Sequence, residues 1–247
     1  MFQAAQTQRA ADLIVDQIRE AILLCDLAPG YRLESERELA VTFDASRATV
    51  RDALATLEEL NLVERKVGNG GGTFVLPITS QAKVRDPNDL VEKWPALVET
   101  LEFRDWLEPL AAEVACQRIS DEKLAELTRI VDFSRRPNCT HEEFRTADIH
   151  FHLMIAEAAQ NSFLSRSIRQ IRVSMNSLLD LMQFSASVTQ QTIAEHSEVL
   201  SALHAHDGDT ARSAMFAHVH HTHCAVMARF GKPGARRPAT VDESGGR

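Results

Sequence analysis

The stretch from about residue 90 to residue 230 constrains the fold most, because it shows helical apolar periodicity throughout and carries no strand signal. Helix-start signals divide it into segments: Ser120 is a candidate N-cap, and Thr140 with Glu143 matches the capping-box pattern. The segment DGD at 207–209 separates the last two helices. The predicted helices are 95–118, 121–134, 141–159, 162–184, 190–206 and 210–230. Together they indicate an all-α domain.

The N-terminal part of the chain has a different pattern, in which short helices are followed by two short strands. Ser35 and Glu38 form another capping box, and the Gly-rich segment VGNGGG joins the two strand candidates. The predicted elements are helices at 9–27, 36–43 and 47–60 and strands at 62–66 and 73–76. Three helices followed by a two-stranded hairpin form a winged helix-turn-helix plan.

We therefore expect a mainly α protein with two domains. Residues 77–89 carry no apolar period, which is typical of a linker, and the last residues are rich in Gly and Pro. The predicted organisation is a winged helix-turn-helix domain at 1–76, a linker at 77–89, a helical domain at 90–231 and a disordered tail at 232–247.

Composition and charge exclude several classes of protein. The four cysteines lie far apart and form no C-x-x-C pair, which argues against a zinc ribbon and fits a reducing cytosol. The chain has no signal-peptide pattern and no apolar run of about 18 residues, so we expect a cytoplasmic protein without membrane contact. A formal net charge of −8 argues against sequence-independent binding of nucleic acid by the whole surface.

The segment SRATVRDAL at 46–54 has the features of a DNA-reading helix. Arg47 and Arg51 are four residues apart on one helix face, and Ser46 and Thr49 lie at the helix start. Arginine binds guanine through two hydrogen bonds, and hydroxyl groups bind phosphates or bases. Spacing alone leaves an ordinary solvated helix face equally open, since residues 1–76 carry 8 Lys and Arg against 12 Asp and Glu.

A second group of residues has the chemistry of a metal site. Asp148 and His152 are spaced i, i+4 and share a helix face, whereas His150 points elsewhere. A carboxylate and an imidazole one turn apart make a pair of metal ligands, and His196 lies in the middle of another helix. A single mid-helix histidine is more often an ordinary core or surface residue.

The segment HVHHTH at 218–223 places four histidines on the last helix, but helical geometry spreads them around the axis. Only His218 and His221 are close enough in angle to serve one inward-facing site. We expect His220 and His223 to be solvated.

The N-terminal residues resemble the DNA-binding domain of the GntR family of bacterial transcription regulators. The resemblance covers LAPGYRLESERELAVTFDASRATVRDALATLEELNLVERK and the following GGGTFV, including the SR-x-x-VR-x-AL recognition helix. It implies a winged helix-turn-helix that contacts DNA. The residues to which it assigns base or phosphate contacts are Arg37, Ser46, Arg47, Thr49, Arg51 and Gly72.

The C-terminal residues resemble the FCD effector domain of the FadR-type subfamily. The matching features are D-x-x-FH, the histidine in EHSEVLSAL and the segment GDTARSAMFAHV. The resemblance implies that Asp148, His152, His196 and His218 hold one divalent ion, Zn, Ni, Mn or Fe, inside a six- or seven-helix bundle. It also implies a small organic or sugar acid as the effector, with Arg104 pairing with its carboxylate. Arg172 and Asn176, i and i+4 on another helix, are further candidates.

These features together predict a ligand-responsive repressor that binds palindromic operator DNA as a homodimer. A regulator with a purely structural metal and an acyl ligand is the alternative, but Arg104 and the Asp/His set disfavour an apolar chain. A metal-dependent enzyme is also disfavoured. The chain has no H-E-x-x-H motif, and a DNA-reading domain has no use on such an enzyme.

Overall fold

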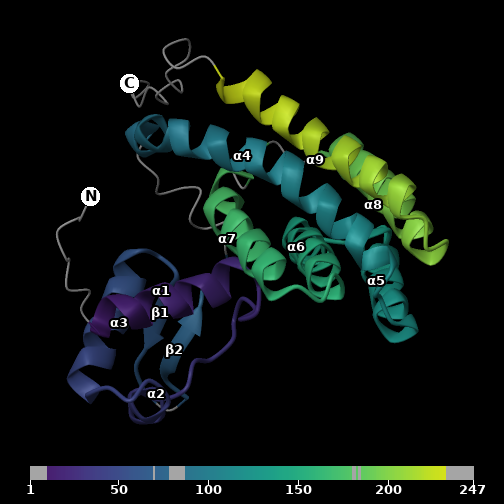
Figure 1. Cartoon of the computed structure of the whole chain (residues 1–247). Helices are drawn as coiled ribbons and strands as arrows, with labels where there is room; N and C mark the ends of the chain where they lie inside the picture. The colour runs from purple at the N-terminus through teal and green to yellow at the C-terminus, as the bar shows by residue number, and fades with distance from the viewer. Residues whose placement is uncertain (1–9, 69, 78–86, 180–181, 183–184, 232–247) are drawn as a thin grey trace, which may run out of the picture.

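The computed structural model describes residues 10–68, 70–77, 87–179, 182 and 185–231. These residues form a small N-terminal unit with a two-stranded sheet beside a larger unit built from helices alone (Figure 1). The predicted mainly α fold, with a winged helix-turn-helix followed by an all-α bundle, is confirmed. The predicted tail and residues 78–86 of the predicted linker lie outside the described residues. None of the described helices is long and apolar enough to cross a membrane.

The winged unit is held together by one apolar face of its first helix. Ile14, Ile18 and Ile22 recur every four residues and pack in one cluster with Leu54 and Leu57. The strands are antiparallel, with Val63 opposite Val75 and Lys66 opposite Gly72. Its elements are α1 (Ala10–Leu23), α2 (Glu36–Thr42), α3 (Arg47–Glu59), β1 (Val63–Lys66) and β2 (Gly72–Val75).

Helix ends in this unit follow the local capping chemistry. The Ser35 hydroxyl accepts from the Glu38 backbone N–H and the Glu38 carboxylate accepts from the Ser35 backbone N–H, so the predicted capping box is present. The prediction that the first helix reaches residue 27 is wrong. It ends at Leu23, and Cys25 adopts a left-handed φ of 60°, which interrupts the helix.

The larger unit is organised around its first helix, which contacts four of the others. This helix runs between α9 on one side and α6 and α7 on the other (Figure 1). The helices are α4 (Pro87–Cys116), α5 (Asp121–Ser134), α6 (His141–Ala158), α7 (Ser162–Leu179), α8 (Ala186–His204) and α9 (Gly208–Phe230). Six helices within the described residues fall in the predicted range of six or seven.

Two helix starts lie four or more residues before the predicted ones. The first helix of the bundle begins at Pro87 rather than at residue 95, which takes in the end of the predicted linker. Proline suits the first turn of a helix because its missing N–H has no intrahelical partner there. Helix α8 begins at Ala186 rather than at residue 190, because the Ser185 hydroxyl caps it by accepting from the Val188 N–H.

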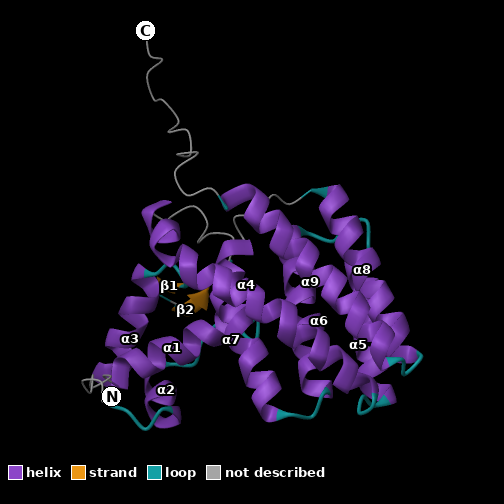
Figure 2. Cartoon of the chain, turned by 45° about the horizontal axis from the view of Figure 1, so that its top comes forward, coloured by secondary structure: helices purple, strands orange, loops and turns teal. Residues whose placement is uncertain are grey.

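The two units meet where α1 contacts α7, as Figures 1 and 2 both show. The Asn176 side-chain amide donates to the Leu23 carbonyl at 2.7 Å, at the end of α1. Arg169 forms ion pairs with Glu20 at 3.2 Å and Asp26 at 2.8 Å. Helix α7 is therefore bonded directly to the first helix of the winged unit.

Candidate functional site

Helix α3 presents its predicted DNA-contacting side chains to solvent. Arg47 and Arg51 are exposed, and neither has an acidic partner within ion-pair distance among the described residues. The Ser46 hydroxyl caps the helix by accepting from the Thr49 N–H at 3.1 Å, and the two hydroxyls are 2.8 Å apart. The helix therefore begins with two unpaired cations and two hydroxyls on one end, which matches a recognition helix.

The other two predicted DNA contacts have different surroundings. Arg37 is exposed on α2, the helix that precedes the recognition helix. Gly72 lies at the start of β2 opposite Lys66. Gly72 adopts a φ of 156°, which residues with a Cβ rarely adopt, and a Cβ atom there would also come within 2.7 Å of Nε of Arg32.

In the bundle, the four predicted metal ligands converge from three helices. Asp148 and His152 come from α6, His196 from α8 and His218 from α9. The His218 Nε2 atom is 3.1 Å from the His152 Nε2 atom and 3.3 Å from the His196 Nε2 atom. Oδ1 of Asp148 is 3.5 Å from the His196 Nε2 atom and 3.7 Å from the His152 Nε2 atom. All four donor atoms lie within 4.8 Å of one another.

These spacings fit a single divalent ion. Two donor atoms about 2.1 Å from one ion are about 3.0 Å apart in octahedral and about 3.4 Å apart in tetrahedral geometry. Two of the histidines, His196 and His218, are also held in the neutral form that binds metals. Burial and the neighbouring His218 hold the pKa of His196 well below its usual value, and burial lowers the pKa of His218. Their Nε2 atoms are therefore available as lone-pair donors.

Two carboxylates outside the cluster orient the imidazole rings. Glu108 contacts Nδ1 of His152, and Oε2 of Glu195 is 2.8 Å from Nδ1 of His218. Burial opposes ionisation of Glu108, but Arg104 and then His152 hold its pKa well below the usual range. Each carboxylate can thus accept the Nδ1–H, which turns the Nε2 lone pair toward the cluster, as in carboxylate–histidine–metal arrangements.

Two of the predicted effector residues lie beside the cluster with hydrogen-bonding capacity left over. Arg104 and Arg172 are 1% and 0% exposed. Arg172 pairs with Oδ2 of Asp148, and Arg104 pairs with Glu108 at 2.8 Å. Nevertheless NH1 of Arg104 and both Nε and NH1 of Arg172 have no partner within the described part of the chain. Leaving a buried donor unpaired costs about 1–3 kcal/mol, so these N–H groups would gain from donating to the acceptor atoms of a ligand.

Comparisons with known proteins agree with both halves of the chain. Residues 10–75 match the family described as "Bacterial regulatory proteins, gntR family", and residues 99–221 match the FCD domain. The Uxu operon transcriptional regulator of Escherichia coli (strain K12) is 30% identical over 230 residues, which is 89% of this chain and 87% of the relative. The chain belongs to the GntR family.

A second relative and one solved structure extend the similarity of this GntR-family chain. The putative L-lactate dehydrogenase operon regulatory protein of Escherichia coli (strain K12) is 32% identical over 241 residues, covering 93% of this chain and 90% of the relative. The structure of E. coli McbR/YncC has a TM-score of 0.55 at 19% identity, over 91% of this chain and 100% of that one. The chain is thus a DNA-binding transcription regulator of the GntR/FCD type, and the prediction that it is not an enzyme is confirmed.

The remaining histidines of this GntR-family regulator lie outside the four-residue cluster. Nδ1 of His221 is 3.0 Å from Oε1 of Glu195, the carboxylate that also holds His218. His220 and His223 both contact Asp105 on α4. The expectation of solvation fits His220, whose side chain is 48% exposed, but it is wrong for His223. The His223 side chain is only 15% exposed, because α9 packs against α4 at this point.

The outer carboxylates and the contact of Asn176 were not predicted. Glu195 precedes His196 in the sequence but serves His218 on the neighbouring helix, so only the packing of α8 against α9 reveals its role. Glu108 has a weak sequence signal, since it lies one turn after Arg104 on α4. Asn176 is completely buried, but its amide is bonded to Leu23 in α1 rather than turned to the cluster.

We predict that His196→Ala loses tightly bound divalent metal, whereas His150→Ala, a control on α6 outside the cluster, retains it. Glu195→Gln should keep the metal but weaken its affinity by about 10–100-fold, as expected for loss of an outer hydrogen bond to a ligand. Elemental analysis after dialysis against a weak chelator, followed by chelator competition, measures both effects. Wild-type stoichiometry in His196→Ala would contradict the assignment and make His221 the first replacement ligand to test.

Proposed function

We propose that this regulator senses a small carboxylate at a divalent ion, Zn, Ni, Mn or Fe, held by Asp148, His152, His196 and His218. Acid binding then changes the affinity of a homodimer for a palindromic operator. The supporting observation is the pair of buried guanidinium groups beside the cluster, Arg104 and Arg172, whose unpartnered N–H groups can donate to a carboxylate of opposite charge. An acyl chain would leave these donors unpaired.

The charge balance around the cluster also favours an anionic effector. Three arginines, Arg104, Arg145 and Arg172, and three carboxylates, Glu108, Asp148 and Glu195, surround the histidines, so their formal charges sum to zero. A divalent ion adds two positive charges to this largely buried region. Uncompensated charge is costly in a protein interior, so the loaded site favours an anion over a neutral ligand.

The names of the relatives suggest which acid to test first. One of them is named for the L-lactate dehydrogenase operon, and L-lactate is a small hydroxy acid. Its carboxylate and hydroxyl could occupy two open coordination positions of the ion. L-lactate is therefore the first probe, with lactamide as the uncharged analogue.

DNA binding is proposed to occur through the exposed end of α3. Arg47 and Arg51 would contact base edges. Ser46 and Thr49 would contact phosphates or bases where the helix enters the groove, and Arg37 would contact the DNA backbone. The wing contribution from Gly72 is the weakest, because this glycine packs against Arg32.

A homodimer is supported by an apolar stripe on the outer surface of the bundle. Phe103, Trp106 and Leu110 recur at helical spacing on α4 and are all exposed, and Phe216 of α9 is exposed as well. Large exposed apolar side chains that lie together mark protein–protein interfaces. A second copy of this chain is the proposed occupant, because a palindromic operator requires two winged domains.

Helix α7 supplies a direct connection between the effector site and the winged domain. Arg172 contacts the metal ligand Asp148, and Asn176 one turn later donates to Leu23 in α1. About one turn before Arg172 on the same helix, Arg169 pairs with Glu20 and Asp26. An acid that rearranges Arg172 would therefore act on a helix that is already bonded to α1. This route through α7 and α1 would act together with any change in the spacing of the two winged domains of the dimer.

For DNA binding, we predict that Arg47→Ala and Arg51→Ala weaken specific DNA binding strongly, since each bidentate arginine–guanine contact contributes about 1–3 kcal/mol. The operator is first selected from randomised duplexes with the wild-type protein, and affinities are then measured by gel shift. Arg19→Ala, which removes the same charge from the exposed face of α1, is the matched control and should bind normally. Affinities within about threefold of wild type for both α3 variants would refute the assignment of the recognition helix.

For the coupling, we predict that L-lactate or another small hydroxy acid shifts operator affinity by about 5–150-fold, and that operator DNA shifts acid affinity by the same factor. Arg104→Gln should lose acid binding. Asn176→Ala should still bind the acid but lose most of the shift, whereas Ser174→Ala, an exposed control on α7, should behave as wild type.

The measurements are fluorescence anisotropy of operator DNA with and without acid, and calorimetry of acid binding to each variant. A response to lactamide equal to that of the acid would contradict the carboxylate proposal. A full shift in Asn176→Ala would show that coupling passes through the linker or the dimer contact instead of the α7–α1 bond.

A further inference from the structure

A second group of metal-ligating side chains lies on the opposite side of α9 from the four-residue cluster. Asp105 from α4 faces His220 and His223, which are spaced i, i+3 on α9. Oδ2 of Asp105 is 2.9 Å from Nδ1 of His220 and 2.7 Å from Nδ1 of His223. One donor atom from each residue lies within 4.8 Å of the others. His220 is about 200° round the helix from His218, so the two groups face different sides.

The carboxylate of this group is not fully satisfied by the two histidines. Asp105 is 8% exposed, and its Oδ1 atom is buried without a hydrogen-bond partner among the residues that the structure describes. A buried carboxylate oxygen without a partner carries a desolvation cost that a cation would remove. This observation is independent of the clustering of the three residues and points to a positively charged ligand.

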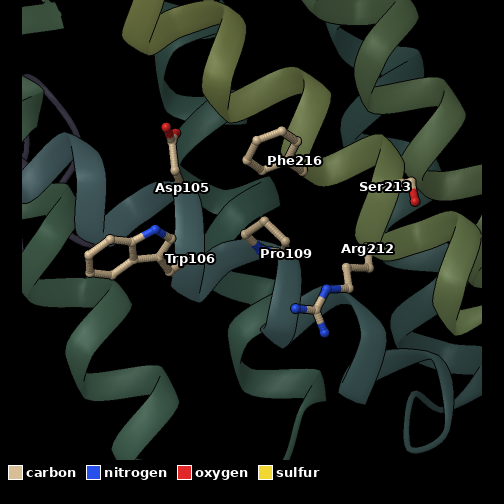
Figure 3. Close-up of a pocket in the computed structure, with 6 residues that line it drawn as sticks. All are labelled: Asp105, Trp106, Pro109, Arg212, Ser213 and Phe216. Atoms are coloured by element: carbon tan, nitrogen blue, oxygen red, sulfur yellow. The ribbon is translucent and has the colours of Figure 1, made fainter.

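A single copy of the chain leaves the group accessible from outside, at the border of the apolar stripe proposed as the dimer contact. The His220 side chain is 48% exposed and its ring stacks on Phe216 at a centroid distance of 5.2 Å, which fixes its orientation. Asp105 and Phe216 also line an open hollow of about 550 Å³ between α4 and α9 (Figure 3). Cys224 lies on the other side of the His220 ring, with Sγ 3.6 Å from Nε2, so it does not face the same point.

We propose that Asp105, His220 and His223 form a second divalent-metal site, suited to Zn²⁺ or a similar transition-metal ion. Two imidazoles and one carboxylate are a common ligand set for such ions and leave coordination positions open to water. When the ion binds, each neutral imidazole changes tautomer: its proton moves to Nε2, and the Nδ1 lone pair faces the ion instead of an N–H facing Asp105. The donor atoms, now 2.7–2.9 Å apart, must separate slightly to about 3.0–3.4 Å. With three ligands and an exposed edge, this site is weaker than the buried one.

The test is a titration of untagged, metal-free protein with Zn²⁺, read by calorimetry and by chelator competition. The wild type should show a tight and a weaker class of site, one equivalent each. His223→Ala and Asp105→Asn should lose only the weaker class, and His196→Ala only the tight class. His204→Ala, an exposed histidine at the end of α8, is the matched control and should keep both. Circular dichroism of every variant shows that the fold is retained.

The identity of the ligands is tested by replacing Zn²⁺ with Co²⁺. The weaker site should give a cobalt spectrum without a thiolate charge-transfer band, and Cys224→Ser should leave that spectrum unchanged. One equivalent in the wild type, retention of the weaker class in both His223→Ala and Asp105→Asn, or its loss in Cys224→Ser would each overturn the proposal. The two classes of site are measured separately. If His196→Ala kept the tight class, the result would contradict the proposed sensing site but would not affect the proposal of the second site.

Discussion

Compensation of buried charge is the constraint on which the effector domain depends. Arg104 neutralises Glu108, Glu108 holds His152, His152 faces Asp148, and Arg172 neutralises Asp148. Breaking a buried ion pair by removing one partner costs about 3–5 kcal/mol, so each member of this chain of contacts fixes the next. Burial raises the pKa of Asp148, yet Arg172 and then His152 hold it well below the usual range, and the carboxylate stays ionised. The polar centre therefore sets where α4, α6, α7, α8 and α9 lie relative to one another.

The same contacts explain how the helical domain can be held together by the groups that would also respond to a bound acid. Arg172 is completely buried and bonded to Asp148, a proposed metal ligand, but two of its nitrogen atoms have no partner among the described residues. Its helix is also bonded to the first helix of the winged domain through Asn176, which donates to Leu23, and Arg169, which pairs with Glu20. A ligand that satisfies the free donors would change the balance of forces on α7. The proposed regulation thus needs no element beyond those that already hold the bundle together.

The sequence predicted the features that depend on local spacing and missed those that depend on helix pairing. The capping boxes at Ser35 and Thr140 are present because they involve residues three apart. The i, i+4 relation of Asp148 and His152 likewise places both in one cluster. Helical angles alone left both His218 and His221 as candidates. The resemblance named His218, and the packing of α9 against α8 with the approach of His218 to His152 places it in the cluster. Asp105, Glu108 and Glu195 were missed as partners of histidines because each acts on a residue of another helix.

Anomalous X-ray diffraction from crystals grown with the divalent metal and the acid that shifts operator affinity tests the central claim most directly. The account predicts one strong peak within about 2.0–2.2 Å of Oδ1 of Asp148 and the three Nε2 atoms of His152, His196 and His218. It also predicts the acid on that ion, with its carboxylate bonded to Arg104 or Arg172. A peak elsewhere with none at these four residues, or an acid bound away from the ion and from both arginines, would contradict it.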